Sequence, residues 1–318
     1  MEARKIIITG GATRIGAAIA KKLSGLNKEI LIHFNKSKTK AVILKNELEK
    51  NGTKVYLVKG DLGKESDIKK IIKFAKSKLK YFDCLINNAS LFENDKLENF
   101  TNSSWENHIN TNLKAPALLT KAFSKNIKKG NNNIVNIIDQ RVFKLTPFFF
   151  SYTLSKTGLY TLTKTSAMSL SPNIRVNGIA PGPTLKNIRQ SEKHFKKQYL
   201  ATPLKRQVDV KEICNAVDFF IKNRSITGQV LAIDSARSLP GPLVDSLAVT
   251  VMRYTNTRLL HSCGGELLRR AWCCVLLLQH HHRLAVLGDN ILPRGATSCQ
   301  PEESCDAARL RGYPLRDK

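Results

Sequence analysis

Short β-rich runs alternate with longer helical segments through residues 1–234, and this alternation constrains the fold more than any other feature. The expected strands are Lys5–Thr9, Glu29–Phe34, Lys54–Val58, Cys84–Ile86, Asn133–Ile138, Ile174–Ile179 and Gln229–Ile233. The clearest helical patterns between them are Ile15–Leu23, Lys38–Asn51, Ser66–Leu79 and Lys211–Lys222. Strands that are buried on both faces are apolar without interruption, as Ile6-Ile7-Ile8 is. The pattern predicts an α/β fold with a doubly wound parallel sheet.

A glycine-rich turn, Thr9-Gly-Gly-Ala-Thr-Arg-Ile-Gly16, follows the first expected strand and leads into a helix. In such sheets ligands bind beyond the carboxyl ends of the strands. Glycines let the backbone approach a pyrophosphate, and a helix N-terminus favours its negative charge. A tight turn without a ligand is the alternative, but the position after the first strand favours nucleotide binding.

The end of the second expected strand indicates which nicotinamide cofactor binds. An acidic residue there would hold the ribose hydroxyl of NAD. This chain has Asn35-Lys36-Ser37 instead, and a lysine and a serine can bind a 2′-phosphate. The sequence therefore predicts NADPH, although Lys36 can also be one more surface lysine in a lysine-rich chain. Asp61, after the third strand, is expected beside the adenine.

Tyr152 and Lys156 are spaced i,i+4 at the start of an expected helix, so their side chains share one face. A phenol is a poor acid at neutral pH, and a nearby ammonium lowers its pKa. Such a pair can supply a proton to an atom that receives a hydride. Helix surfaces often carry such pairs, so the assignment depends on the surrounding motifs.

Together with the glycine-rich turn, the motifs Asn87-Asn88-Ala89, Asn112, Tyr152/Lys156 and Arg175–Gly182 follow the order found in the short-chain dehydrogenase/reductase family. Residues 5–239 resemble that family, which implies a single-domain Rossmann fold, a nicotinamide cofactor and a homotetramer. The resemblance assigns Tyr152 as the acid/base and Asn112 to a proton relay. It assigns Lys156 to the nicotinamide ribose and to lowering the Tyr152 pKa.

Two departures from the family pattern point to its pteridine reductase and dihydromonapterin reductase branch. Arg14 replaces the middle glycine of the turn, and Asp139 stands 13 residues before Tyr152, where a catalytic serine is usual. A carboxyl group suits a substrate with ring nitrogens, because it can exchange protons with them. Phe92 matches the aromatic residue that stacks on the pterin in that branch, and such stacking is physically favourable.

The expected function is NADPH-dependent reduction of a pterin or folate C=N bond. The expected catalytic residues are Asp139, Tyr152, Lys156 and Asn112, and the expected substrate contacts are Arg14, Ser90, Phe92, Asp139 and Tyr152. The expected cofactor contacts are Gly10, Arg14, Ile15, Gly16, Asn35, Lys36, Ser37, Asp61, Leu62, Asn88, Ala89, Lys156, Pro181 and Gly182. The lysine-rich segment 183–206 resembles the family's mobile substrate loop.

Two alternatives remain open on the sequence. One is a carbonyl or 3-oxoacyl-thioester reductase of the same family, against which Asp139 argues. The other is a non-catalytic protein that binds nucleotides or nucleic acid, suggested by a formal net charge of +27. The lysines are spread over many helices rather than clustered with aromatics, so we expect no nucleic-acid partner.

Residues 240–318 differ in composition from the rest, with arginine replacing lysine and five cysteines (Cys263, Cys273, Cys274, Cys299 and Cys305). We expect an unrecognised, disordered and non-native extension to a reductase domain at 1–239. The histidines His280–His282 beside Cys273-Cys274 do not have the spacing of a metal site, and we expect no metal. No apolar run approaches the length of a membrane span, so we expect a cytoplasmic protein without a membrane partner.

Overall fold

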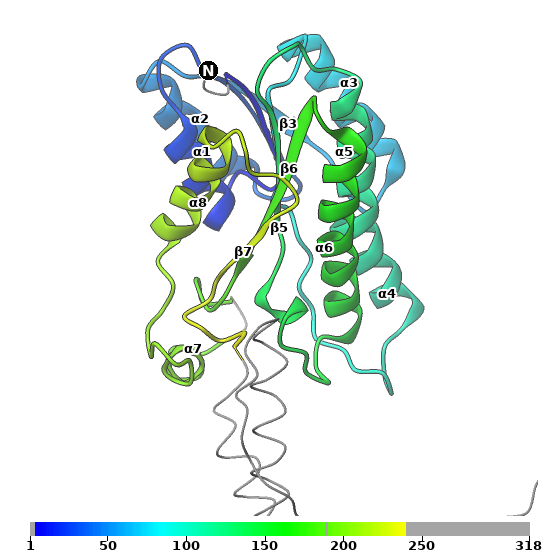
Figure 1. Ribbon diagram of the computed structural model, residues 1–318, viewed down its shortest axis with the longest axis vertical. Helices are drawn as coiled ribbons and strands as arrows, with labels where there is room; N and C mark the ends of the chain where they lie inside the picture. The colour runs from blue at the N-terminus through cyan, green and yellow to red at the C-terminus, as the bar shows by residue number, and fades with distance from the viewer. Residues whose placement is uncertain (1–3, 188–189, 240–318) are drawn as a thin grey trace, which may run out of the picture. The chain divides into compact units, whose positions relative to one another are not determined.

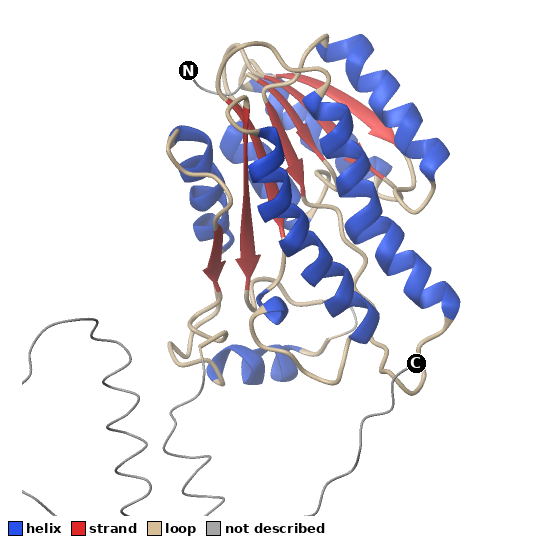
Figure 2. Cartoon of the chain, turned by 45° about the vertical axis from the view of Figure 1, so that its right-hand side comes forward, coloured by secondary structure: helices blue, strands red, loops and turns tan. Residues whose placement is uncertain are grey.

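The computed structural model describes residues 4–187 and 190–239. Its centre is one seven-stranded sheet with the order β3-β2-β1-β4-β5-β6-β7. The strands are β1 (Lys5–Ile8), β2 (Glu29–Phe34), β3 (Lys54–Lys59), β4 (Cys84–Asn87), β5 (Asn132–Ile137), β6 (Ile174–Pro181) and β7 (Val230–Ile233). All neighbouring pairs are parallel, and the strand arrows accordingly point toward one edge of the sheet (Figure 2).

Helices cover both faces of this sheet (Figure 1). They are α1 (Arg14–Leu23), α2 (Lys38–Lys50), α3 (Glu65–Leu79), α4 (Asn102–Ile109), α5 (Ala115–Ser124), α6 (Phe150–Leu170), α7 (Glu192–Leu200) and α8 (Val210–Lys222). A π-helical turn, η1 (Asn110–Lys114), joins α4 to α5, and a 3-10 turn, η2 (Gln140–Val142), follows β5. Helices α1, α2 and α8 lie on one face, and α3, α5 and α6 lie on the other.

The apolar strands explain this layering. In β1, Ile6 and Ile8 pack into the core beneath α1, α2 and α8, whereas Ile7 packs into the core on the opposite face. Successive side chains of a strand point to opposite faces, so an uninterrupted apolar run can fill two cores at once. Burying such a side chain contributes about 1.5–3 kcal/mol.

The predicted doubly wound α/β fold is confirmed. The expected strands and the four clearest helices all form, with ends within one or two residues of those expected. The segment 183–206 contains helix α7, which the sequence analysis did not anticipate. Helices α4 and α5 and the π-helical turn between them were also not predicted.

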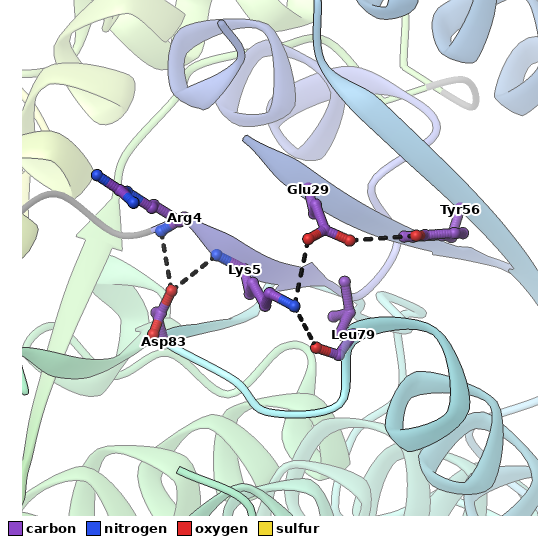
Figure 3. A network of polar contacts seen from close by, with 6 residues as sticks. All are labelled: Arg4, Lys5, Glu29, Tyr56, Leu79 and Asp83. Carbon is purple, nitrogen blue, oxygen red and sulfur yellow. Dashed lines mark hydrogen bonds and ion pairs between the residues drawn. The ribbon is translucent and has the colours of Figure 1, made fainter. Parts of the chain in front are cut away.

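A polar network closes the amino edge of the sheet, opposite the edge where ligands are expected (Figure 3). The Lys5 ammonium pairs with Glu29 at 3.2 Å and donates to the Leu79 carbonyl oxygen at 2.6 Å. Glu29 also accepts the Tyr56 hydroxyl at 3.1 Å, and Asp83 accepts the backbone N–H of Lys5 at 2.9 Å. These contacts tie β1, β2 and β3 together, so this edge has a structural role.

Within the described residues, no helix combines the length and the apolar character needed to cross a lipid bilayer. The predicted extension at 240–318, with its cysteines and histidines, lies outside the described residues.

Candidate active site

The glycine-rich turn after β1 is fixed by a buried histidine. Gly10 has a φ of +59°, which a glycine adopts at little cost, and its N–H donates to Nδ1 of His33 at 3.2 Å. The other ring nitrogen, Nε2, lies 3.0 Å from the carbonyl oxygen of Gly60. Burial lowers the pKa of His33, so the ring is neutral and its partners place the proton on Nε2. These contacts of His33 with the turn were not predicted from the sequence.

Asn88 ties the same turn to the end of β4. Its Nδ2 donates to the carbonyl oxygens of Thr9 and Gly10, at 2.9 and 3.0 Å. The backbones pack closely here, because a Cβ added to Gly10 would lie 2.9 Å from Cα of Ala89. A Cβ on Gly16 would lie 2.4 Å from the carbonyl oxygen of Gly10. Both glycines are therefore required by the shape of this turn.

Arg14 begins helix α1 with a φ of +54°, in the left-handed region that disfavours residues other than glycine. Such a conformation costs about 1–2 kcal/mol. Its guanidinium donates to the carbonyl oxygens of Leu185 and Lys186 at 3.0 and 2.8 Å, which joins the turn to the segment after β6. No side chain caps the first turn of α1, so its N–H groups face the carboxyl edge of the sheet without a side-chain acceptor.

The remaining residues expected to contact the cofactor also lie at this edge. Asn35 and Lys36 are exposed directly after β2, and Ser37 precedes helix α2. Oδ1 of Asp61 accepts the Gly63 N–H at 2.9 Å. Ile15 is half-buried in α1, and Leu62 is buried after β3. Pro181 is buried at the end of β6, and the next residue, Gly182, donates its N–H to the carbonyl oxygen of Ile233.

Tyr152 and Asp139 form the centre of the candidate active site. Asp139 follows β5 at the carboxyl edge of the sheet, and Tyr152 lies in the first turn of α6. The Tyr152 hydroxyl donates to Oδ2 of Asp139 at 2.8 Å, while Oδ1 accepts the backbone N–H of Arg141 at 2.8 Å. A carboxyl group thus occupies the place beside the tyrosine where the family pattern has a serine.

Burial raises the pKa of both groups in this pair. It raises the pKa of Asp139 despite the opposing hydrogen bonds from Arg141 and Tyr152. It raises the pKa of Tyr152 well above its ordinary value, and the charge and hydrogen bond of Asp139 act in the same direction. The Tyr152 pKa is therefore raised overall in this structure, because burial and Asp139 dominate. That the Lys156 ammonium acts to lower it stays a prediction. Tyr152 is a protonated phenol at neutral pH and can donate its proton.

Lys156 lies one helical turn beyond Tyr152 and is buried, with 1% of its surface exposed. Its ammonium donates to the carbonyl oxygen of Ile137 at 2.8 Å and lies 5.8 Å from the centre of the Tyr152 ring. Burial lowers the pKa of Lys156 to about 8, while the charge of Asp139 acts to raise it. The ammonium is therefore mostly charged at neutral pH and favours the phenolate that forms when Tyr152 gives up its proton.

Asn112 lies in the π-helical turn and is fully buried. Its Nδ2 donates to Ser155 Oγ and to the Leu91 carbonyl oxygen, both at 3.0 Å. Its Oδ1 accepts the Leu91 N–H at 2.8 Å and the Ser90 hydroxyl at 3.3 Å. The side chain thus connects the segment after β4 to helix α6. Its hydrogen bonds go to Ser90, Leu91 and Ser155, and none joins it to Tyr152 or Lys156.

Phe92 lies beside Tyr152 and remains 37% exposed. Its ring centre is 4.7 Å from that of Tyr152, in an edge-on arrangement. Phe149 stacks on Phe92 with ring centres 4.4 Å apart and planes 5° apart, so one face of Phe92 is already covered. Phe149 has a φ of +60°, a strained conformation of the kind found at functional sites. Phe149 was not predicted from the sequence, because its position beside Phe92 depends on this backbone conformation.

Asp95 fixes the start of the helix that carries Tyr152, and the sequence analysis missed it. Its Oδ1 accepts the Ser151 N–H at 3.0 Å, its backbone oxygen accepts the Phe150 N–H at 3.1 Å, and its Oδ2 accepts the Ser104 hydroxyl. Helix α6 has no cap from its own preceding residue, so a carboxylate from a distant segment supplies it. A distant cap has no local sequence signature.

The family model of short chain dehydrogenases matches residues 4–197. The chain belongs to this family. The match includes the glycine-rich turn, Asp139, Tyr152 and Lys156, which are the residues that the structure brings to the carboxyl edge of the sheet.

Individual members of the family resemble the chain over most of their own length. FolM alternative dihydrofolate reductase 1 from Brucella suis, solved in complex with NADP, is 40% identical with a TM-score of 0.72, covering 76% of this chain and 98% of that protein. The 3-oxoacyl-(acyl-carrier-protein) reductase FabG of Buchnera aphidicola is 30% identical over 74% of this chain and 98% of its own. FabG of Staphylococcus epidermidis is 27% identical over 73% of this chain and 97% of its own length.

Proposed function

We propose that this chain is an NADPH-dependent reductase that reduces the C=N bond of a pterin or folate. The observation that carries the proposal is the 2.8 Å hydrogen bond between the Tyr152 hydroxyl and the buried Asp139 carboxyl. Burial raises the pKa of the Asp139 carboxyl, and the Tyr152 phenol carries a proton, so this pair suits a substrate whose reacting atom is a basic nitrogen. The 40% identity with a FolM dihydrofolate reductase supports the same substrate class.

The residues at the carboxyl edge fit an NADP cofactor. The uncapped first turn of α1 offers N–H groups to a pyrophosphate, and the absence of a Cβ at Gly10 and Gly16 permits the close turn that precedes it. Lys36 and Ser37 follow β2, where they can bind a 2′-phosphate. NADP-bound relatives such as FolM from Brucella suis support this assignment. When bound, NADPH supplies the hydride.

The proton reaches the substrate nitrogen through residues that the structure places together. Tyr152 donates its hydroxyl proton, and the Lys156 ammonium favours the resulting phenolate. Asp139, already hydrogen-bonded to that hydroxyl, can return a proton to it or pass one to the pterin ring. Ser90 and Phe92 border this pair and are positioned to contact the substrate.

The second candidate is a 3-oxoacyl-thioester reductase, which the FabG relatives favour. The carboxyl of Asp139 argues against it, because an ionised carboxylate repels the oxyanion that forms when a ketone is reduced. Initial rates of NADPH oxidation with 7,8-dihydropterins, 7,8-dihydrofolate, simple ketones and a 3-oxoacyl thioester separate the two candidates. We expect turnover of the dihydropterin or dihydrofolate and little turnover of the others. Activity confined to ketones or the thioester would contradict the proposal.

Lys36 should set the preference for NADPH over NADH. The Lys36→Ala variant should lose about tenfold in kcat/KM for NADPH, the loss expected for one charge-assisted contact to a phosphate, with little change for NADH. Lys40→Ala, at a neighbouring exposed lysine of α2, serves as the control and should change neither value. A wild-type enzyme that prefers NADH would contradict the assignment.

The pH dependence should report the buried Lys156 ammonium. Because its pKa is lowered to about 8, it loses its charge as the pH rises through that value. We expect kcat/KM for NADPH, which reflects the free enzyme, to be level near neutral pH and to fall above about pH 8. Lys156→Arg keeps its charge, so whatever activity remains should lack this fall. A wild-type profile that stays level to about pH 9.5 would show that the charge of Lys156 is not needed.

We also propose that residues 1–239 form the reductase domain, that residues 240–318 are a non-native addition, and that the enzyme is a homotetramer. The domain boundary is supported by the FolM protein of Brucella suis, which matches over 98% of its length with 76% of this chain. The intact mass of the natural protein tests the origin of residues 240–318.

A further inference from the structure

Arg141 lies directly beside the aromatic residues of the candidate site. Its guanidinium carbon is 4.3 Å from the centre of the Phe149 ring and 6.0 Å from that of Phe92. Phe149 stacks on Phe92, and Phe92 contacts Tyr152. The guanidinium is therefore held at the border of the site by stacking on an aromatic face, which leaves its edge available for hydrogen bonds.

Most of the hydrogen-bonding capacity of Arg141 is unused. One nitrogen, Nη1, donates to the Thr146 hydroxyl at 2.9 Å. Among residues 4–187 and 190–239, no carboxylate forms an ion pair with this guanidinium. A guanidinium carries five N–H donors in a planar fork that matches a carboxylate.

A second arginine, Arg237, is close enough to Arg141 for their charges to interact. Its Nη1 donates to the carbonyl oxygen of Gln198 at 3.1 Å, and within the described part of the chain it likewise has no carboxylate within ion-pair distance. Burial lowers the pKa of Arg237, and the nearby charge of Arg141 lowers it further, whereas Asp139 and Asp234 act to raise it. Two half-buried guanidinium groups without a salt bridge among the described residues thus lie within electrostatic range of each other and of Asp139. An anion bound beside them would offset the repulsion between the two cations.

We propose that Arg141 and Arg237 bind a carboxylate on the side chain of the substrate, so that the enzyme prefers an acidic folate to an uncharged pterin. The inference rests on the proposed function, since it concerns which member of the pterin and folate class is reduced. The reacting ring is the same in both, and the arginines lie outside the Tyr152–Asp139 pair. The preference therefore arises from the side chain of the substrate.

The test compares 7,8-dihydrofolate with its dimethyl ester, which has the same ring and the same length but lacks both carboxylates. Arg141→Met retains an apolar chain that can cover Phe149, and Arg237→Met removes the second charge. Each variant should lower kcat/KM for dihydrofolate about tenfold relative to kcat/KM for the ester. Lys144→Met removes an exposed charge from the same segment and should leave that ratio unchanged. The ratio cancels any effect of Arg141 on the pKa of Asp139, because both substrates use that residue.

The outcomes separate this inference from the proposed function. A ratio that falls in the arginine variants, together with a dihydrofolate KM that rises with salt while the ester KM does not, supports carboxylate binding. Equal losses for both substrates, or no loss for either, would overturn it and would leave Arg141 as a residue that only covers Phe149. Wild-type enzyme that reduces neither compound nor any dihydropterin would overturn the proposed function, and this inference with it.

Discussion

Replacing Tyr152 by phenylalanine should abolish most of the reductase activity while leaving the fold intact. In the proposed mechanism the Tyr152 hydroxyl donates the proton, and general acid catalysis typically contributes about 10²–10⁴-fold to a rate. The ring is buried with 4% of its surface exposed, and its hydroxyl donates to Asp139, so phenylalanine fits the same space. We expect kcat to fall by about that factor, with unfolding free energy changed by about 1–2 kcal/mol.

The measurement is steady-state kinetics together with thermal unfolding and the dissociation constant for NADPH. Tyr160→Phe, on the same helix, is the matched control, because Tyr160 contacts Phe143 and Lys164 but not Asp139. It should retain full activity. A Tyr152→Phe enzyme with wild-type kcat and a normal fold would exclude Tyr152 as the proton donor.

Replacing Asp139 should have the second-largest effect and should separate the two candidate functions. Asp139→Asn keeps the acceptor for the Arg141 N–H but cannot exchange a proton, and we expect kcat/KM for the pterin substrate to fall about 100-fold. Asp139→Ser introduces the hydroxyl that the family pattern has at this position. It should lose pterin activity to a similar extent and gain relative activity on a ketone, because a neutral hydroxyl can donate to the developing oxyanion.

Kinetics on both substrate classes, with wild-type and both variants, measure this change in selectivity. The unfolding temperature serves as a control for the backbone contact to Arg141. If Asp139→Asn reduced the pterin at the wild-type rate, the carboxyl would have no part in proton transfer, and the proposed role of Asp139 would be excluded.

The sheet could be predicted from the sequence because its strands are short, apolar and regularly spaced. Runs such as Ile6-Ile7-Ile8 carry their own signal, and the structure places their ends within one or two residues. Helix α4, the π-helical turn and α5 were missed, because their form depends on tertiary contacts such as those of buried Asn112 with Leu91 and Ser155. Helix α7 was missed within a segment that was interpreted as a loop.

The candidate site could be predicted only where a motif marks it. The order of the motifs indicated Tyr152, Lys156 and Asp139, but the direction of the Tyr152 pKa shift depends on burial, which a spacing does not reveal. Arg237 comes from the end of the described chain and approaches Arg141 only in the folded protein. The roles of such residues depend on packing between distant segments, so no local sequence pattern predicts them.

The most direct test of the proposed function is a single-turnover reaction of the full-length enzyme with NADPH that carries deuterium at the transferable position of the nicotinamide and with 7,8-dihydrofolate. The proposed function predicts tetrahydrofolate in which the deuterium is bound to the carbon of the reduced C=N bond, while the new hydrogen on nitrogen exchanges with solvent. The same reaction is run with a dihydropterin, a ketone and a 3-oxoacyl thioester. The proposed function would be contradicted if dihydrofolate and the dihydropterin stayed unreduced while deuterium passed rapidly to the carbonyl carbon of the ketone or thioester.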